Sequence, residues 1–114
     1  ELGKLEHAAA SFESAREGAP GLAISAIAST RLAGLAEDRG APGEAATAYE
    51  DAASVEAYPL RAESLTDAAR CWVEAGESDR ALAVYQRFET EFPDELAAPQ
   101  IDSLIAELRI ARQP

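Results

Sequence analysis

The 114-residue chain contains no Asn and no Met, and it has a single Cys, a single His and a single Lys. With one Cys, an internal disulfide is excluded. Cys71 lies in an apolar helical pattern with no His or basic cluster near it, so we expect a buried packing residue rather than a reactive thiol. The scarcity of Lys and the absence of Asn and Met fit either a GC-rich genome or a salt-adapted organism.

The sequence also lacks the patterns that carry catalysis or cofactor binding. It has no glycine-rich phosphate loop and no Cys/His metal spacing, and His7, its only His, is expected on the exposed side of the first helix. Glu37–Asp38 and Asp94–Glu95 are alternatives for a divalent-ion site, but such sites need several converging oxygens, which favours ordinary surface charge. We therefore expect no enzyme, no cofactor and no metal site.

Long hydrophobic runs and positive charge are scarce as well. No run approaches the ~20 apolar residues that span a bilayer. The net charge of -11 disfavours nucleic acid and anionic membrane surfaces, because a phosphate-bearing partner would be repelled. No signal peptide is visible, and the chain opens at Glu1 rather than at Met, so we expect it to be part of a longer protein.

What the sequence has in excess is alanine, at roughly a quarter of all positions. Alanine has the highest helix propensity and is small enough for helices to pack closely. No stretch alternates apolar and polar residues for long enough to indicate a strand. The sequence predicts an all-α fold.

A regular pattern of landmark residues runs through residues 62–95, AESLTDAARCWVEAGESDRALAVYQRFETEFPDE. A large residue, a small pair and an aromatic are followed by a glycine, an alanine, two aromatics and a proline. These landmarks are Leu65, Ala68, Ala69, Trp72, Gly76, Ala81, Tyr85, Phe88 and Pro93. In residue type and spacing this segment resembles the tetratricopeptide repeat (TPR) family.

The same pattern occurs twice more toward the N-terminus. The middle unit carries the landmarks Leu32, Ala33, Ala36, Gly40, Ala45, Tyr49 and Ala52. The first unit keeps Gly3, Ala8, Phe12, Ala15 and Pro20. We therefore divide residues 1–114, as a single TPR-like domain, into the second helix of a truncated repeat (1–20), two full repeats (21–60 and 61–95) and a capping helix (96–114).

Each landmark type has a physical reason. The alanines Ala8, Ala33, Ala45, Ala69 and Ala81 are small where helices cross closely. Phe12, Tyr49 and Tyr85 are large where the gap between helices is expected to widen. Gly40 and Gly76 fit the left-handed conformation that ends a helix. Pro20, Pro59 and Pro93 prevent helix continuation. Trp72 and Tyr85 are expected to be largely buried.

The C-terminal segment 98–112 has the spacing of an amphipathic helix. Ile101, Leu104, Ile105 and Leu108 form one apolar stripe. Pro99 suits the first turn, and Arg109 and Arg112 suit the last turn. We expect this helix to cap the array. The family resemblance implies a right-handed superhelix of antiparallel helix pairs, a TPR-like α-solenoid fragment.

The resemblance also implies a function, because in this family the first helix of each repeat lines a concave groove that binds a partner protein or peptide. The groove positions implied here are Ile27, Thr30, Arg31, Gly34, Glu37, Asp38, Glu63, Thr66, Asp67, Arg70, Val73, Glu74, Asp102, Ser103 and Arg109. They are net acidic with isolated arginines, so a mixed or basic segment is expected to suit them. Arg31 and Arg70 are expected to set the register of that segment.

One specialisation of the family is not expected here. The clamp that grips the C-terminal carboxylate of chaperones needs Lys and Asn at fixed groove positions. This chain has no Asn, and Thr30, Thr66 and Asp102 occupy the position of the first clamp Lys.

The alternative to a partner-binding scaffold is self-assembly. The truncated first repeat is expected to leave the apolar side of its helix (Leu5, Ala8, Ala9 and Phe12) without a partner in sequence, which favours a homodimer. The segment YQRFETEFPDE also resembles repeats of bacterial cell-envelope TPR proteins, although cytoplasmic members share it. Both compartments stay open.

Overall fold

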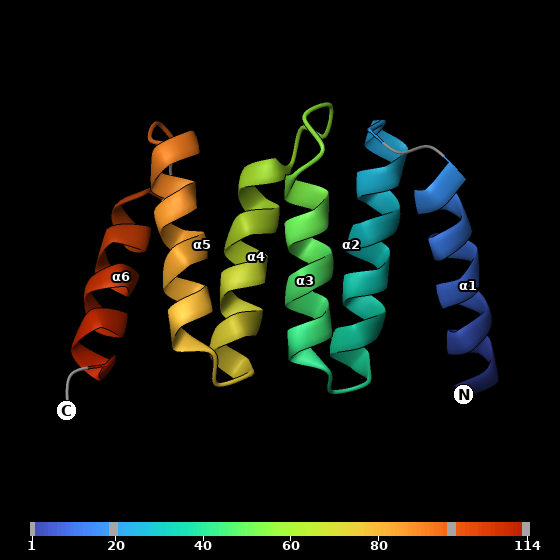
Figure 1. The fold of residues 1–114 in the computed structure, drawn as a ribbon, viewed down its shortest axis with the longest axis horizontal. Coiled ribbons are helices and arrows are strands. Elements are labelled where there is room, and N and C mark those ends of the chain that lie inside the picture. The colour runs from blue at the N-terminus through green and yellow to red at the C-terminus, as the bar shows by residue number, and fades with distance from the viewer. Residues whose placement is uncertain (1, 19–20, 96–97, 113–114) are drawn as a thin grey trace.

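The computed structural model describes residues 2–18, 21–95 and 98–112, which form six α-helices and no strand (Figure 1). The helices are α1 (Leu2–Gly18), α2 (Ala23–Asp38), α3 (Pro42–Ala53), α4 (Arg61–Glu74), α5 (Ser78–Glu91) and α6 (Ala98–Arg112). This confirms the all-α prediction. The helices stand side by side in chain order, in a molecule that extends 43 × 29 × 18 Å.

Glycine fixes the two tightest turns, as the sequence predicts. Gly40, between α2 and α3, has φ +74°, and Gly76, between α4 and α5, has φ +78°. In both turns the amide that follows the glycine bonds back to a carbonyl five residues earlier, from Ala41 to Ala36 (2.9 Å) and from Glu77 to Trp72 (2.8 Å). This pattern satisfies the last carbonyls of a helix and reverses the chain within three residues.

The core contains a small-residue half and a large-residue half. Between α2 and α3 it consists mainly of alanines, and Ala33, Ala36 and Ala45 are at most 3% exposed. Between α4 and α5 it holds Leu65, Trp72, Leu82, Tyr85 and Phe88. Trp72 and Tyr85 are 6% and 5% exposed, which confirms their predicted burial, and Cys71 is fully buried as expected.

The helix α6 adds Ile101 and Ile105 to the same core, and Leu108 packs partly against it. Leu104, predicted to belong to the same stripe, is 36% exposed. The reason is that α6 packs mainly against α5. A single neighbouring helix covers a strip of α6 that is too narrow to bury all four residues of the apolar stripe.

The helix α1 packs against α2. Ala8, Ala9 and Phe12 are partly buried, while Pro20 and the side chain of Leu5 lie outside the described residues. The sequence predicts that the apolar side of α1 is unpaired. In the described residues, the chain itself covers this side in part. The homodimer that this side suggested stays a prediction.

Side chains also connect alternate helices. Arg16 of α1 contacts Asp51 of α3 (3.4 Å), Arg70 of α4 contacts Glu37 of α2 (2.8 Å), and Arg87 of α5 donates to the carbonyl of Ala53 in α3 (3.5 Å). Helices α1, α3 and α5 therefore form one row, which we call the odd row. Helices α2 and α4 lie next to each other in the other row.

None of the described helices is both long enough and apolar enough to cross a bilayer.

Candidate functional site

An open groove of about 520 Å³ lies over α2 and α4, and we call it the α2/α4 groove. Six of the residues that line it were predicted from the sequence: Thr30, Arg31, Gly34, Asp38, Glu63 and Asp67. Six others were not predicted: Phe12, Leu35, Tyr49, Tyr58, Leu60 and Ser64. The predicted residues are mostly charged or small, and most of those that were missed are apolar or aromatic.

The remaining predicted positions lie beside or away from this groove. Ile27 is 45% exposed, one turn before Arg31 on α2. Arg70 forms ion pairs with Glu37 and with Glu74. A further group is not among the lining residues, namely Thr66, Val73, Asp102, Ser103 and Arg109. The last three belong to α6, which packs mainly against α5.

Arg70 is the centre of an ion-pair network within the chain. Its guanidinium lies 2.8 Å from the carboxylate of Glu37, 3.2 Å from that of Glu74 and 3.6 Å from that of Asp67. Because three acids of the same chain surround it, Arg70 is already compensated. Its main role is to link α2 to α4, and it has little unpaired charge to offer a ligand.

The protonation equilibria of this network follow from its contacts. The hydrogen bond to Arg70 lowers the pKa of Glu37, and the same bond raises the pKa of Arg70. Burial raises the pKa of Asp67, and the nearby Arg70 only partly opposes it. Both Glu37 and Arg70 are therefore stabilised in their charged forms, whereas Asp67 keeps its charge at a cost.

Tyr49 and Cys71 complete the surroundings of Glu37. The Tyr49 hydroxyl donates a 2.6 Å hydrogen bond to Glu37, and burial and this carboxylate raise the pKa of Tyr49. Burial also raises the pKa of the Cys71 thiol to about 11, with the charge of Glu37 acting in the same direction. At neutral pH Cys71 is a thiol, which is a poor nucleophile.

In contrast to Arg70, three charged residues of the groove have no side-chain partner. Arg31, Asp38 and Glu63 are exposed, and none of them forms an ion pair or side-chain hydrogen bond within the described part of the chain. Their charges are available to a molecule that enters the groove. Two acids and one base leave this unpaired set net negative.

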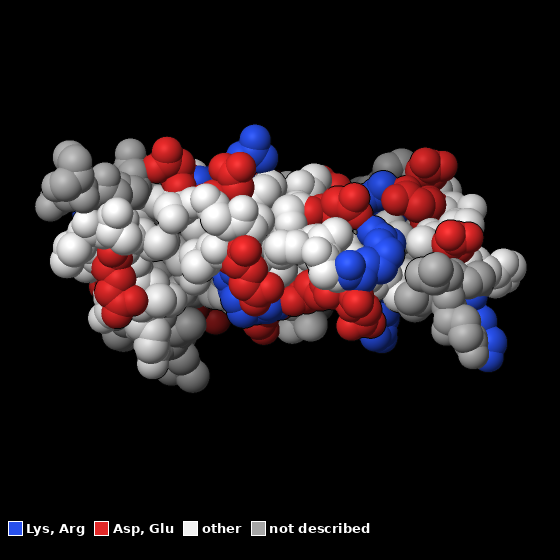
Figure 2. Space-filling model, turned by 90° about the horizontal axis from the view of Figure 1, so that it is seen from below, with Lys and Arg blue, Asp and Glu red and all other residues white. Residues whose placement is uncertain are grey.

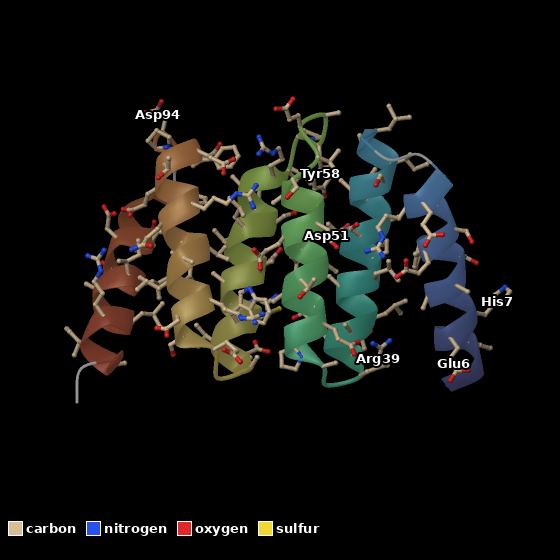
Figure 3. All side chains as sticks on the ribbon, viewed as in Figure 1. Glu6, His7, Arg39, Asp51, Tyr58 and Asp94 are labelled. Carbon is tan, nitrogen blue, oxygen red and sulfur yellow. The ribbon has the colours of Figure 1, made fainter. Side chains whose placement is uncertain are left out.

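Tyr58 is the least expected member of the groove. It lies in the connection between α3 and α4, which the sequence marks only as a linker (Figure 3). It is 8% exposed and packs with Ala26 and Ala52, and Val55 lies partly against them. An aromatic residue in a linker between two helices is the signal that could have indicated this role.

The opposite side of the array has two smaller hollows, whose charges are satisfied within the chain. One, of about 390 Å³, contains the ion pairs of Arg16 with Asp51 and of Arg39 with Glu44. The other is a hollow of about 340 Å³ over Trp72. There the Trp72 indole donates to Glu50 (2.7 Å), and Arg80 stacks 4.8 Å from a Trp72 ring centroid.

The acidic balance is visible on the surface. Figure 2 shows acidic side chains along the whole length of the face seen from below, with fewer basic side chains among them.

Figure 3 shows His7 on the side of α1 that faces away from α2. Within residues 2–18, 21–95 and 98–112, no three or more His, Cys, Asp or Glu side chains are grouped so that they could hold a metal ion.

Comparison of the chain with protein-family models, with curated proteins and with solved structures gives no match.

Proposed function

We propose that the chain is a TPR-like fragment, a right-handed superhelix of antiparallel helix pairs with α6 as its cap. The support is the agreement of the landmarks with their surroundings. Gly40 and Gly76 end helices in the left-handed conformation, and Ala33, Ala45 and Ala69 are fully buried at helix contacts. The contacts between α2 and α4 are those expected when first helices of successive repeats lie side by side.

We propose further that this array is a scaffold that binds a partner protein or peptide through the α2/α4 groove, as part of a larger chain. The observation that carries the proposal is which charged side chains of the groove form ion pairs and which do not. Within residues 2–18, 21–95 and 98–112, Arg31, Asp38 and Glu63 have no side-chain partner, whereas the charges in the hollows of the opposite side are paired within the chain. A surface that leaves both charges and apolar side chains free is suited to binding another molecule.

Site-specific photo-crosslinking in the full-length protein, in the cells that produce it, tests the proposal. A photoreactive residue at Ile27 is next to the groove, and one at Ala83, exposed on α5, is on the odd row. We expect a discrete crosslinked protein from position 27 and none from position 83. Products from position 83 alone, or from neither position, would contradict groove binding.

A charge-reversal pair provides a second test once a partner is captured. Arg31→Glu should weaken capture of that partner, since its charge is otherwise available in the groove. The matched control is Glu6→Arg, because Glu6 is exposed on α1 and forms no ion pair or side-chain hydrogen bond with the described residues. Glu50 is a poor control, since it accepts the Trp72 hydrogen bond. Equal capture by both variants and the wild type would rule out the groove as the binding site.

A further inference from the structure

The α2/α4 groove has an apolar end. Leu60, just before α4, lines the groove and is 47% exposed. Ile24 and Ile27, in the first two turns of α2, are not among the lining residues and are 54% and 45% exposed. The starts of both helices lie at the end of the array that carries the connection with Tyr58 (Figure 1, Figure 3). Exposed large aliphatic side chains that gather at one end of a groove indicate where an apolar group binds.

The other end of the groove is acidic. Asp38 is the last residue of α2, and Asp67 lines the groove in the middle of α4. Arg70 does not cancel this charge, because it is shared among Glu37, Asp67 and Glu74. This end therefore attracts a cation.

We propose that the α2/α4 groove binds an extended segment of a partner protein with an apolar side chain at one end and a Lys or Arg at the other. The apolar side chain packs on Ile27 and Leu60, and the basic one pairs with Asp38 and Asp67. This inference rests on the proposed scaffold function. A second copy of the chain fits poorly as occupant, because its net charge of -11 would be brought against an acidic groove.

The length of α2 beside the groove sets the spacing expected in an extended segment. Asp38 lies 11 positions after Ile27, which is about 16 Å along the helix. An extended chain covers the same distance in about five residues.

Arg31 has a separate role in this arrangement. It lies one turn beyond Ile27, between the apolar and acidic ends, and forms no ion pair or side-chain hydrogen bond with any residue that the structure describes. An extended segment leaves its backbone carbonyls unpaired, and a guanidinium has five N–H donors to offer them. Arg31 therefore binds the middle of the segment whatever its side chains are, while the two ends of the groove select the sequence.

Selection from a displayed library of random nine-residue peptides tests the proposal. The purified chain is the bait, at low salt. We expect the enriched peptides to carry Leu, Ile or Phe and, about five residues away, Lys or Arg. A synthetic copy of one enriched peptide is then measured by fluorescence anisotropy. Asp38→Arg should weaken its binding about tenfold or more, and the matched Glu6→Arg should leave it nearly unchanged.

The outcomes separate the two proposals. Enriched peptides that need Ile27 and Arg31 but are acidic, or lack the spaced basic residue, overturn the inference and leave the scaffold function standing. Enrichment that is insensitive to Ile27→Arg and to Asp38→Arg overturns both. Both substituted acids, Asp38 and Glu6, are exposed, and thermal unfolding checks that each variant folds.

Discussion

At the scale of single residues, Tyr85 contributes strongly to packing between α4 and α5. Its side chain is 5% exposed and belongs to the main core. Tyr85→Ala should lower the free energy of unfolding by about 3 kcal/mol or more, because it leaves a cavity that rigid neighbouring helices cannot fill. Urea denaturation measures this loss.

The control for Tyr85 is its neighbour in sequence, Gln86, which is exposed on the same helix. Gln86→Ala should change the free energy of unfolding by less than about 0.5 kcal/mol. Similar losses at both positions would mean that α5 does not pack as described.

Glu37 makes the contact between α2 and α4 sensitive to acidic pH. The hydrogen bond from Arg70 lowers its pKa below the ordinary 4.5, so the stabilisation that Glu37 gives is complete above that value. It is lost as the pH falls through the lowered pKa. Glu37→Gln should cost about 1 kcal/mol at pH 7. The gap between the two unfolding free energies should narrow as the pH falls below 4.5 and through the lowered pKa of Glu37.

Glu74→Gln is the matched control for Glu37. Glu74 contacts the same Arg70 but is 53% exposed, against 26% for Glu37. Exposed pairs of this kind contribute at most a few tenths of a kcal/mol. If the two variants lose the same stability, or if the loss at Glu37 persists in acid, the network does not carry the contact.

Arg31 and Arg70 show what residue type alone cannot predict. Both were expected to set the register of a ligand, and both lie on the α2 and α4 faces. Arg70 meets Glu37, which is 33 residues away in sequence, and this contact exists only because the two helices are neighbours in space. Among the described residues, Arg31 forms no ion pair. The long-range pairing of Arg70, which residue type does not reveal, therefore separates the two arginines.

At the scale of elements, glycine has opposite effects in a turn and in a helix. Gly76→Ala should cost about 1–2 kcal/mol, because φ is +78° and a side chain is strained in the left-handed region. Gly34→Ala, inside α2 with open space around its Cβ position, should raise stability by about 0.5–1 kcal/mol. Thermal and urea unfolding of the two variants measures both effects. Effects of the same sign would contradict the turn geometry.

Most helices could be predicted from the sequence, whereas the connection between α3 and α4 could not. The stripe that begins at Ile101 placed the last helix at residues 98–112, and the structure has the same bounds. Residues 54–60 carry no hydrophobic periodicity. Their packing depends instead on the position of α2. Tyr58 meets Ala26, 32 positions earlier, and so forms one wall of the groove that the charged positions alone did not indicate.

At the scale of the whole molecule, the net charge of -11 destabilises the folded state through self-repulsion. Added NaCl screens that repulsion, so Tm should rise by a few degrees between about 0.05 and 0.5 M salt. Glu6→Lys/Glu56→Lys/Glu107→Lys changes exposed acids only, and at two charges each it brings the net charge from -11 to -5. The Tm of this triple variant should rise less with added NaCl than that of the wild type. A Tm that falls with salt would show that local ion pairs outweigh the net charge.

Each helix packs mainly against its neighbours in the chain, and this gives the array a gradient of local unfolding. Helices α3 and α4 are held from both sides, whereas α6 is held mainly by α5. Amide hydrogens should therefore exchange fastest in α6 and slowest in α3 and α4, as mass spectrometry of deuterium uptake can measure. The groove walls on α4 belong to the part that opens last, so a bound segment would rest on the most persistent portion of an array that unravels from its ends.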